Sequence, residues 1–305
     1  MDESSLSYRQ QQEKVNAHFQ AEAPYWKDIY ARKTMYAELY RARLATTLAW
    51  IGDLVLAPGS RVLEVGCGAG FLSVELAKRG LRVHAIDSTE TMVELTRRHA
   101  EESGVTELLS VGVGDVCDLA WEDGCFDLVV ALGVITWLER PEMAIREMAR
   151  VSMPGGHVLL TADNRKRLIY LLDPAMNPAL APLRRNMRSI LERIGVLCGS
   201  QGRIKENLYD IDFIDLALAK AKLTKVKGTT FGFGPFTFLG RRFIPKFFDI
   251  MLHSHMQRLA NRHVPGFNTG GSQYLVLARK SASRLHKHAT SSGEFVSASD
   301  KDHEV

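Results

Sequence analysis

The chain has 305 residues, of which 46% are hydrophobic and 24% charged, and its formal net charge is +4. This composition can bury a substantial core in one elaborated domain or two small ones, while the mild positive charge does not by itself indicate a nucleic-acid partner. No apolar run approaches the roughly 18 residues of a membrane span, and no secretory signal pattern opens the chain, so we expect a cytoplasmic protein.

Disulfide and metal chemistry are not expected from the residue pattern. The cysteines form no C-x-x-C pair, and we interpret all of them as reduced thiols. They are Cys67, Cys117, Cys125 and Cys198. No group of potential ligands has convincing metal-binding spacing, so we expect no metal site.

The N-terminal part of the chain divides into two segments. Residues 1–15 are polar and glutamine-rich, and we expect them to form a flexible N-terminus. Residues 16–58 are predicted to form a helical cap that is unusually rich in aromatic side chains. Apolar residues recur at helical spacing towards its end, which gives the last helix a core-facing side.

A glycine-rich turn follows the first predicted strand. Val62, Leu63 and Val65 form a short apolar run around Glu64, glycines stand at positions 66, 68 and 70, and a helix-forming segment begins at Phe71. A strand, a glycine turn and a helix N-terminus together present free N–H groups to a nucleotide-like ligand. The dinucleotide fingerprint requires glycine at its sixth position, where this chain has Phe71.

Two further acidic positions continue the pattern. The second predicted strand ends in Asp87, where a carboxylate can accept both ribose hydroxyls of a nucleoside. The third is followed by Gly114, Asp115 and Val116. We expect Asp115 to accept from an adenine amino group while the Val116 N–H binds a ring nitrogen.

Strand-like and helix-like segments alternate through this region. Predicted strands cover residues 61–65, 81–87, 109–113, 126–132 and 157–162, and predicted helices cover residues 71–79, 89–103 and 141–152. Such alternation predicts a parallel sheet with helices on both faces.

The order of these motifs resembles that of class I S-adenosylmethionine (SAM) methyltransferases over about residues 60–165. The markers are Glu-x-Gly-x-Gly-x-Gly from Glu64, the acidic Asp87, Gly-Asp at 114–115, Phe-Asp-Leu-Val from Phe126 and Pro-Gly-Gly from Pro154. The resemblance implies an α/β fold with a Rossmann-like, mostly parallel sheet of seven strands. Its last strand, at residues 273–278, is antiparallel and inserts between the fifth and sixth.

The resemblance also implies a domain organisation. The SAM-binding core is predicted at residues 59–165, a lid insertion at 166–210, and the C-terminal part of the core at 211–280, with a second insertion at 231–270. Residues 281–305 have no apolar period and are predicted to be a disordered tail.

SAM is the implied cofactor, and two groups of residues are implied to surround it. The predicted cofactor-binding residues are Glu64, Gly66, Cys67, Gly68, Gly70, Asp87, Ser88, Met92, Asp115, Val116, Ala131 and Leu132. For Met92, packing on the adenine and packing in the core are both open. The predicted lid over the methionine end and the acceptor consists of Tyr25, Trp26, Tyr30, Arg43 and Trp137.

Both insertions combine basic, apolar and aromatic residues. A basic amphipathic helix is predicted at residues 182–194, and aromatic residues alternate with glycines and arginines at residues 231–248. Such segments suit a lipophilic substrate and peripheral contact with an anionic membrane surface. The alternative is that they pack on each other and expose their arginines to water.

The resemblance implies a methyltransferase acting on a small lipophilic acceptor, at a hydroxyl, phenol or carboxyl oxygen, with loose similarity to ubiquinone-pathway O-methyltransferases. Many relatives have a histidine near the position where this chain has Trp137. The most obvious general base is therefore absent from that position, and the catalytic residues are unknown. A hydroxyl acceptor needs a base, for which His253, His255 and His263 are the candidates.

The alternatives are an RNA or protein methyltransferase and a non-catalytic SAM-fold or nucleotide-binding protein. No Asn-Pro-Pro-Tyr motif follows the fourth strand, so we expect no nucleic-acid partner. The sequence does not assign an oligomeric state.

Overall fold

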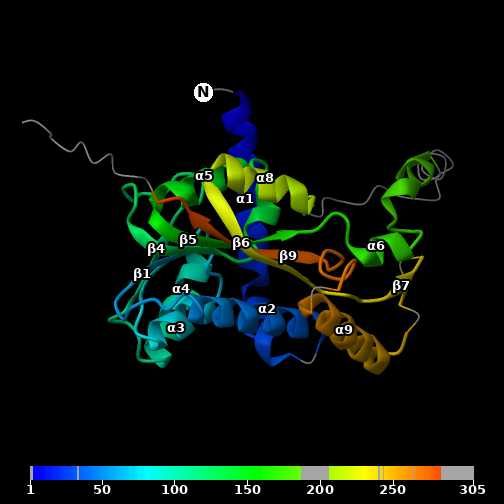
Figure 1. Ribbon diagram of the computed structural model, residues 1–305, viewed down its shortest axis with the longest axis horizontal. Coiled ribbons are helices and arrows are strands. Elements are labelled where there is room, and N and C mark those ends of the chain that lie inside the picture. Colours follow the sequence, from blue (N-terminus) through cyan, green and yellow to red (C-terminus); the bar gives the residue numbers. More distant parts are fainter. Residues whose placement is uncertain are drawn as a thin grey trace, which may run out of the picture.

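The computed structural model describes residues 3–32, 34–186, 206–239, 241–242, 244–262 and 264–282 (Figure 1). Most of the helix predicted at 182–194, together with Cys198, His263 and nearly all of the predicted tail, lies outside these residues.

A seven-stranded sheet forms the centre of the molecule (Figure 1). Its strands are β1 (Arg61–Val65), β2 (Arg82–Asp87), β3 (Leu109–Val113), β4 (Phe126–Ala131), β5 (Ser152–Asp163), β6 (Leu223–Phe231) and β9 (Gln273–Lys280). They lie in the order β3-β2-β1-β4-β5-β9-β6, and β9 is antiparallel to both of its neighbours. The predicted fold class and the inserted antiparallel strand are therefore confirmed. β5 begins earlier than expected, because Ser152 already pairs with Phe126.

Helices cover both faces of the sheet, as the alternation predicted (Figure 1). One layer contains α2 (Met35–Gly52), α3 (Phe71–Lys78) and α4 (Glu90–Glu102), and the other contains α5 (Pro141–Val151) and α8 (Ile211–Lys220). Because the sheet is covered on both faces, its central strands β1, β4 and β9 are buried over most of their length. Buried side chains form two apolar cores, one on each side of the sheet.

The N-terminus differs from the expected flexible segment. α1 (Glu3–Lys27) is one helix that runs through the boundary predicted at residues 15 and 16, and Val15 is buried. Asn16 fixes this helix to the carboxyl end of β2, because the Ser88 hydroxyl donates to Asn16 Oδ1 at 2.8 Å. A short 3-10 turn, η1 (Ile29–Ala31), then leads to α2.

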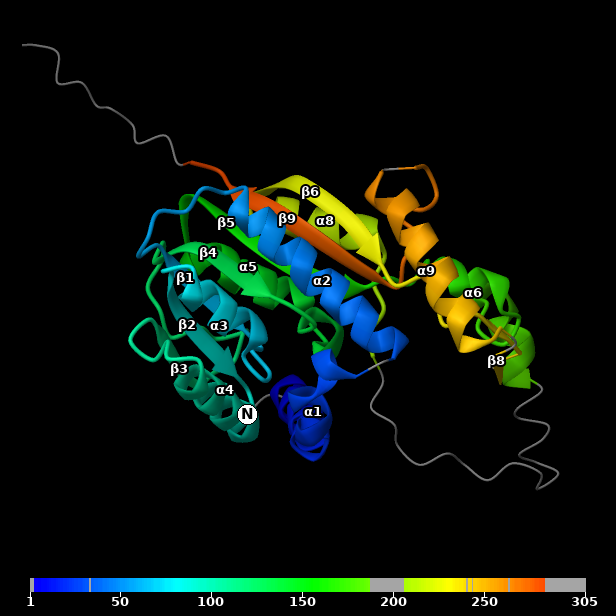
Figure 2. The same cartoon turned by 90° about the horizontal axis from the view of Figure 1, so that it is seen from below.

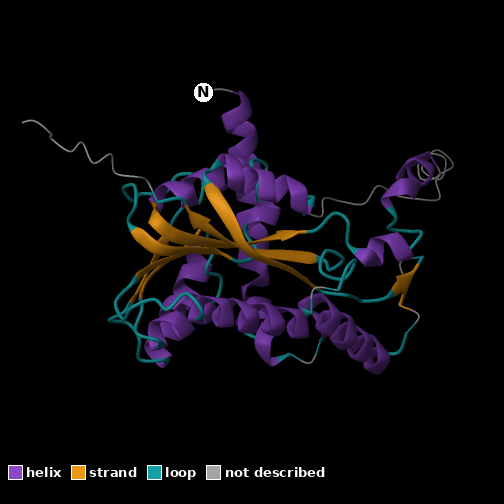
Figure 3. Ribbon diagram, in the orientation of Figure 1, coloured by secondary structure: helices purple, strands orange, loops and turns teal. Residues whose placement is uncertain are grey.

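The two insertions lie side by side at one end of the molecule (Figures 1 and 2). The first contains α6 (Leu168–Leu172) and η3 (Pro178–Leu180), and the second contains the small hairpin β7 (Thr237–Phe238) and β8 (Arg241–Arg242) followed by α9 (Lys246–Asn261). Figure 3 shows this hairpin separate from the main sheet. Phe233, Phe236, Met256 and Ala260 form a third apolar cluster against Leu168, so the insertions share a core.

Candidate active site

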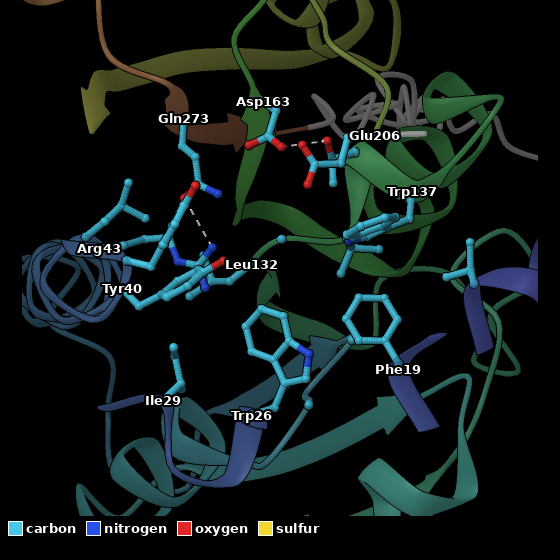
Figure 4. Close-up of a pocket in the computed structure, with 18 of the residues that line it drawn as sticks. Phe19, Trp26, Ile29, Tyr40, Arg43, Leu132, Trp137, Asp163, Glu206 and Gln273 are labelled. Atoms are coloured by element: carbon cyan, nitrogen blue, oxygen red, sulfur yellow. Dashed lines mark hydrogen bonds between the residues drawn. The ribbon is translucent and has the colours of Figure 1, made fainter. Parts of the chain in front are cut away.

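A cavity of about 400 Å³ opens at the carboxyl ends of the central strands. This is within the size range of small-molecule sites, about 300–1,000 Å³. Its walls come from the glycine loop, the ends of β2, β4, β5 and β9, the helices α1 and α2, and both insertions (Figure 4). In an open α/β sheet this edge is where ligands bind.

All three loop glycines have positive φ, but the space around a side chain differs between the three positions. A Cβ on Gly66 would lie 2.3 Å from Val134 Cγ2, and one on Gly70 would lie 2.6 Å from Thr96 Cγ2. A Cβ on Gly68 would meet nothing within 4 Å. Gly66 and Gly70 therefore allow close packing of the loop, whereas Gly68 faces the open cavity. Gly70 itself does not line the cavity.

Glu64 brings a buried carboxyl group to the floor of the cavity. It is 3% exposed, and the Ser73 hydroxyl donates to its Oε2. Burial raises the pKa of Glu64 to about 8, against the opposing effect of the Ser73 hydrogen bond. A cationic group bound beside Glu64 would favour its ionised form.

Asp87 is held in one orientation by its own loop. Gly68 N–H donates to Oδ2 at 3.0 Å, and the Thr89 N–H and hydroxyl donate to Oδ1 at 3.0 and 2.9 Å. Burial raises the pKa of Asp87, and these hydrogen bonds oppose that rise. The carboxylate also lines the cavity, where its remaining lone pairs can accept ligand hydroxyls.

Most other predicted cofactor residues also line the cavity. These are Cys67, Ser88, Met92, Asp115, Val116 and Leu132. Met92 is 1% exposed, so it contributes both to the core and to the cavity wall. Ala131 is fully buried at the end of β4 and does not line the cavity, because its side chain belongs to the apolar core.

Aromatic side chains from α1, α2 and the loop after β4 form one wall (Figure 4). Phe19 makes an edge contact with Trp137 at 5.2 Å between ring centroids and a tilted contact with Trp26 at 5.9 Å. Trp26 in turn meets the Tyr40 ring at 5.5 Å. Tyr25 does not line the cavity, contrary to prediction, because its ring packs against Trp26 and beneath Arg32 on the outer side.

Arg43 is the most deeply buried cation of the cavity, at 7% exposed. Its Nη1 donates to Gln273 Oε1 at 3.3 Å, and its guanidinium lies 4.6 Å from the centroid of the Tyr40 ring. Its Nε is buried without a hydrogen-bond partner. Burial raises the pKa of neighbouring Tyr30, and the Arg43 charge opposes that rise. A buried cation with only neutral partners is poorly compensated, so Arg43 is suited to an anionic ligand group.

Sequence reasoning missed the polar residues at the far end of the cavity, which are Asp163, Arg167, Glu206 and Gln273. Asp163 is 8% exposed, and its Oδ2 accepts from the Thr136 hydroxyl at 2.9 Å. It pairs across the β5–β9 ladder with Gln273, which brings the carboxyl end of β5 beside Arg43. The one available signal was the position of Asp163 directly after an apolar strand.

Two of the three histidines proposed as bases, His253 and His255, do not reach the cavity. His253 is buried on α9, where its Nδ1 accepts from the Phe233 N–H at 3.1 Å, and burial lowers its pKa. His255 is exposed on the same helix. His263 lies outside the described residues. For His253 and His255 the prediction was wrong, because α9 packs against β6 and the segment around Phe233 and not over the glycine loop.

Cys67 and Cys125 are free thiols. The part of the chain that the structure describes contains no group of three or more His, Cys, Asp or Glu residues arranged to hold a metal ion. Nor does any helix there have the length and apolar character needed to cross a membrane.

The sheet order, the glycine loop and the strand-end carboxylates together define a class I SAM-dependent methyltransferase fold. The family described as "Methyltransferase domain" matches residues 63–160. The chain therefore has the class I SAM-dependent methyltransferase fold that the resemblance implied, and the family match covers residues 63–160 of it.

Relatives and solved structures agree with this assignment. A ubiquinone biosynthesis O-methyltransferase of Xanthomonas campestris pv. campestris is 37% identical over 126 residues, which are 41% of this chain and 52% of that protein. The one from Xanthomonas axonopodis pv. citri is 34% identical over 159 residues, 52% of this chain and 61% of that protein. The chain thus spans about half the length of the curated relatives that it matches.

The fold extends beyond the matched segment. The crystal structure of magnesium protoporphyrin IX methyltransferase from Synechocystis PCC 6803 with bound SAH superposes with a TM-score of 0.60 at 17% identity, over 89% of this chain and 100% of that chain. The cyclase SpnF gives a TM-score of 0.56 at 18% identity, over 88% and 95% of the two chains. At such identities the likeness concerns the fold alone.

Proposed function

We propose that this protein transfers a methyl group from SAM to an oxygen atom of a small, lipophilic acceptor. One observation carries the proposal: a single cavity runs from the glycine loop and strand-end carboxylates to an aromatic and apolar region beyond β4 and β5. A cofactor and an acceptor bound at its two ends would meet inside the protein, away from bulk water.

The residues at the first end fit SAM. The open space above Gly68 suits the methionine moiety, Glu64 suits its ammonium group and Arg43 its carboxylate. Asp87 suits the ribose hydroxyls, and Asp115 with Val116 suits the adenine. Each of these assignments pairs a ligand group with a complementary charge or hydrogen-bonding group.

When bound, SAM supplies an activated methyl on its sulfonium, so the protein mainly has to align the acceptor with it. Trp26, Trp137 and Tyr40 provide flat walls that can orient an aromatic or aliphatic acceptor. If the acceptor is a hydroxyl or phenol, Asp163 is the residue that we propose takes its proton. It lines the cavity, and Thr136 holds its carboxylate in place.

Relatives favour oxygen as the acceptor atom, because those of about 37% identity are named ubiquinone biosynthesis O-methyltransferases. The partial overlap with them leaves the acceptor to be established by experiment. RNA or protein methylation and non-catalytic cofactor binding are the alternatives, and no described feature favours either.

We further propose that the insertion end of the molecule contacts an anionic membrane surface. Large apolar side chains are exposed on both insertions, namely Leu171, Leu172, Leu183, Phe238, Leu239, Phe247, Phe248 and Met251. Exposed arginines accompany them at positions 185, 241 and 242. Clustered exposed apolar residues with neighbouring basic groups are typical of interfacial binding. The same insertions line the cavity, so a lipophilic acceptor could enter from the membrane.

The experiment that tests the function begins with calorimetric titration of the purified protein with SAM, S-adenosylhomocysteine and NAD. Binding of the first two and not of NAD is expected. Methyl transfer from labelled SAM to lipophilic phenols, alcohols and acids would then be measured, with bulk RNA and protein as comparison substrates. Cofactor binding without transfer to any of them would contradict the proposed activity and favour the non-catalytic alternative.

A further inference from the structure

The cavity wall contains unpaired hydrogen-bond donors. Among the described residues, the buried side-chain polar atoms without a partner include three on cavity-lining residues: Trp26 Nε1, Arg43 Nε and Arg167 Nη2. All three are N–H groups, and two belong to cations. Because buried polar groups are normally satisfied, such donors point to a ligand rich in hydrogen-bond acceptors.

Arg167 is the cation of this set that lies in the lid insertion, outside the expected cofactor residues. Its Nε donates to the Asn164 carbonyl at 3.0 Å, and its guanidinium stacks 4.3 Å from the centroid of the Tyr170 ring. Asn164 is itself buried and donates to the Thr269 and Gly271 carbonyls at 2.7 and 2.8 Å. The Asn164 carbonyl and the Tyr170 ring therefore hold the guanidinium in place. Its unpaired Nη2 group thus has a fixed position before a ligand binds.

The positive charge of Arg167 has no ion-pair partner among the described residues. No carboxylate of the described residues forms an ion pair with it within 4.0 Å. Asp163 lines the same cavity, and its carboxylate would repel an anion that lay beside it. An anionic ligand group is consequently favoured only where it can contact a guanidinium.

The neighbouring surface is apolar. Ile169, Tyr170 and Met176 belong to the same insertion as Arg167 and line the same cavity. A ligand bound here would thus combine an anionic group with an apolar body.

We propose that the acceptor is an amphiphilic carboxylic acid whose carboxylate binds the Arg167 guanidinium while its apolar body lies along the lid insertion. A carboxylate matches the planar guanidinium and carries a single charge. A phosphate monoester fits less well, because its second charge would meet the Asp163 carboxylate in the same cavity. This inference deepens the proposed function by naming the acceptor class.

The test compares binding of 2-naphthoic acid, its neutral isostere 2-naphthamide and 2-naphthyl phosphate to the full-length protein. Dissociation constants would be measured by calorimetry, with and without saturating S-adenosylhomocysteine. The variants are Arg167→Gln, Arg167→Lys and the control Lys166→Gln. Lys166 is exposed and does not line the cavity, so the control removes one neighbouring positive charge only.

We expect the acid to bind the native protein and the Lys166→Gln control about tenfold more tightly than the amide, as for a charge-assisted hydrogen bond. Arg167→Gln should bring the two ligands to similar affinity, and Arg167→Lys should restore part of the preference. The phosphate should bind more weakly than the acid. Unchanged affinity for S-adenosylhomocysteine in Arg167→Gln would show that the variant is folded.

Three results would overturn the inference: no binding of the acid, an acid-to-amide ratio unaffected by Arg167→Gln, or tighter binding of the phosphate. Failure of the proposed function gives a different pattern. Methyl transfer from SAM would then fail with every acceptor, or S-adenosylhomocysteine would not bind, while the comparison of acid with amide in its absence would still report on Arg167.

Discussion

The side chains of Arg43 and Gln273 meet at 3.3 Å although 230 positions separate them in the chain. The contact joins α2 to the first residue of the antiparallel strand β9. Gln273 is in turn the ladder partner of Asp163, so these three residues bring the cofactor half and the acceptor half of the cavity together. Their contact has consequences for cofactor binding that can be measured.

We predict that Arg43→Gln weakens SAM binding by about tenfold or more, because a buried charge-assisted hydrogen bond to the cofactor carboxylate is lost. Calorimetric titration measures the effect. Arg82→Gln, which removes an exposed arginine far from the cavity, is the matched control and should bind normally. Equal affinity of the Arg43 variant and the native protein would assign Arg43 a structural role only.

Gly68→Ala should lower SAM affinity by about tenfold or more, because its Cβ would project into the space open to the methionine moiety. The control is Gly80→Ala. Gly80 also has a positive φ, +81° compared with +57° for Gly68, and its Cβ would likewise meet nothing within 4 Å. Both variants should lose about 1 kcal/mol of stability from backbone strain, as measured by thermal unfolding. Only Gly68→Ala should lose affinity, and normal binding by that variant would contradict the loop assignment.

SAM binding is predicted to release protons near pH 7. Burial raises the pKa of Glu64 to about 8 in the free protein, so this carboxyl is mostly protonated at neutral pH. A cofactor ammonium favours the carboxylate and lowers that pKa, so affinity should increase with pH, by about tenfold between pH 6.5 and pH 8. Calorimetry in buffers of different ionisation enthalpy measures the released protons.

The matched variant Glu64→Gln cannot release this proton, so its affinity should be lower and nearly independent of pH over the same range. Proton release that persists undiminished in Glu64→Gln would assign the titration to another group.

Asp163→Asn should reduce the turnover number with a hydroxyl or phenol acceptor by about 10²-fold or more, the usual contribution of a positioned base. SAM affinity should stay close to native. The methyl-transfer rate of the Asp163→Asn variant should also rise more steeply towards high pH, because without the base the acceptor must ionise by itself. Steady-state rates across pH measure both effects, with Asp212→Asn on the exposed side of α8 as the control. A variant with native turnover and an unchanged pH profile would exclude Asp163 as the base.

The double variant Phe247→Ser and Phe248→Ser should lose binding to anionic vesicles, because both exposed rings, 73% and 52% accessible, would no longer insert. Co-sedimentation with vesicles that contain phosphatidylglycerol measures this, and zwitterionic vesicles should bind less at low salt. Leu216→Ser removes an exposed apolar residue, 53% accessible, from α8 at a distance from the insertions, and should have no effect. Absence of vesicle binding by the native protein would refute the membrane proposal.

The cofactor half of the site was predictable from the sequence because its residues follow from local chain geometry. The glycines, Glu64 and Asp87 lie at the ends of two successive strand–turn–helix units, where strand and helix direction fix their positions. The same reasoning predicted the sheet, since alternating apolar strands and helices can bury their surfaces in few ways. Ala131 was misjudged by a single position, because adjacent residues of a strand face opposite sides.

The acceptor half was decided by the tertiary structure. Asp163 with Arg167, Glu206, and Gln273 come from three separate segments and carry no shared motif. They meet because β9 inserts between β5 and β6 and because the insertions pack on each other. His253 and His255, which were candidates by residue type, are placed away from the cavity by the packing of α9. Short-range backbone geometry is thus encoded in neighbouring residues, whereas a site assembled by side-chain packing between distant segments depends on the whole fold.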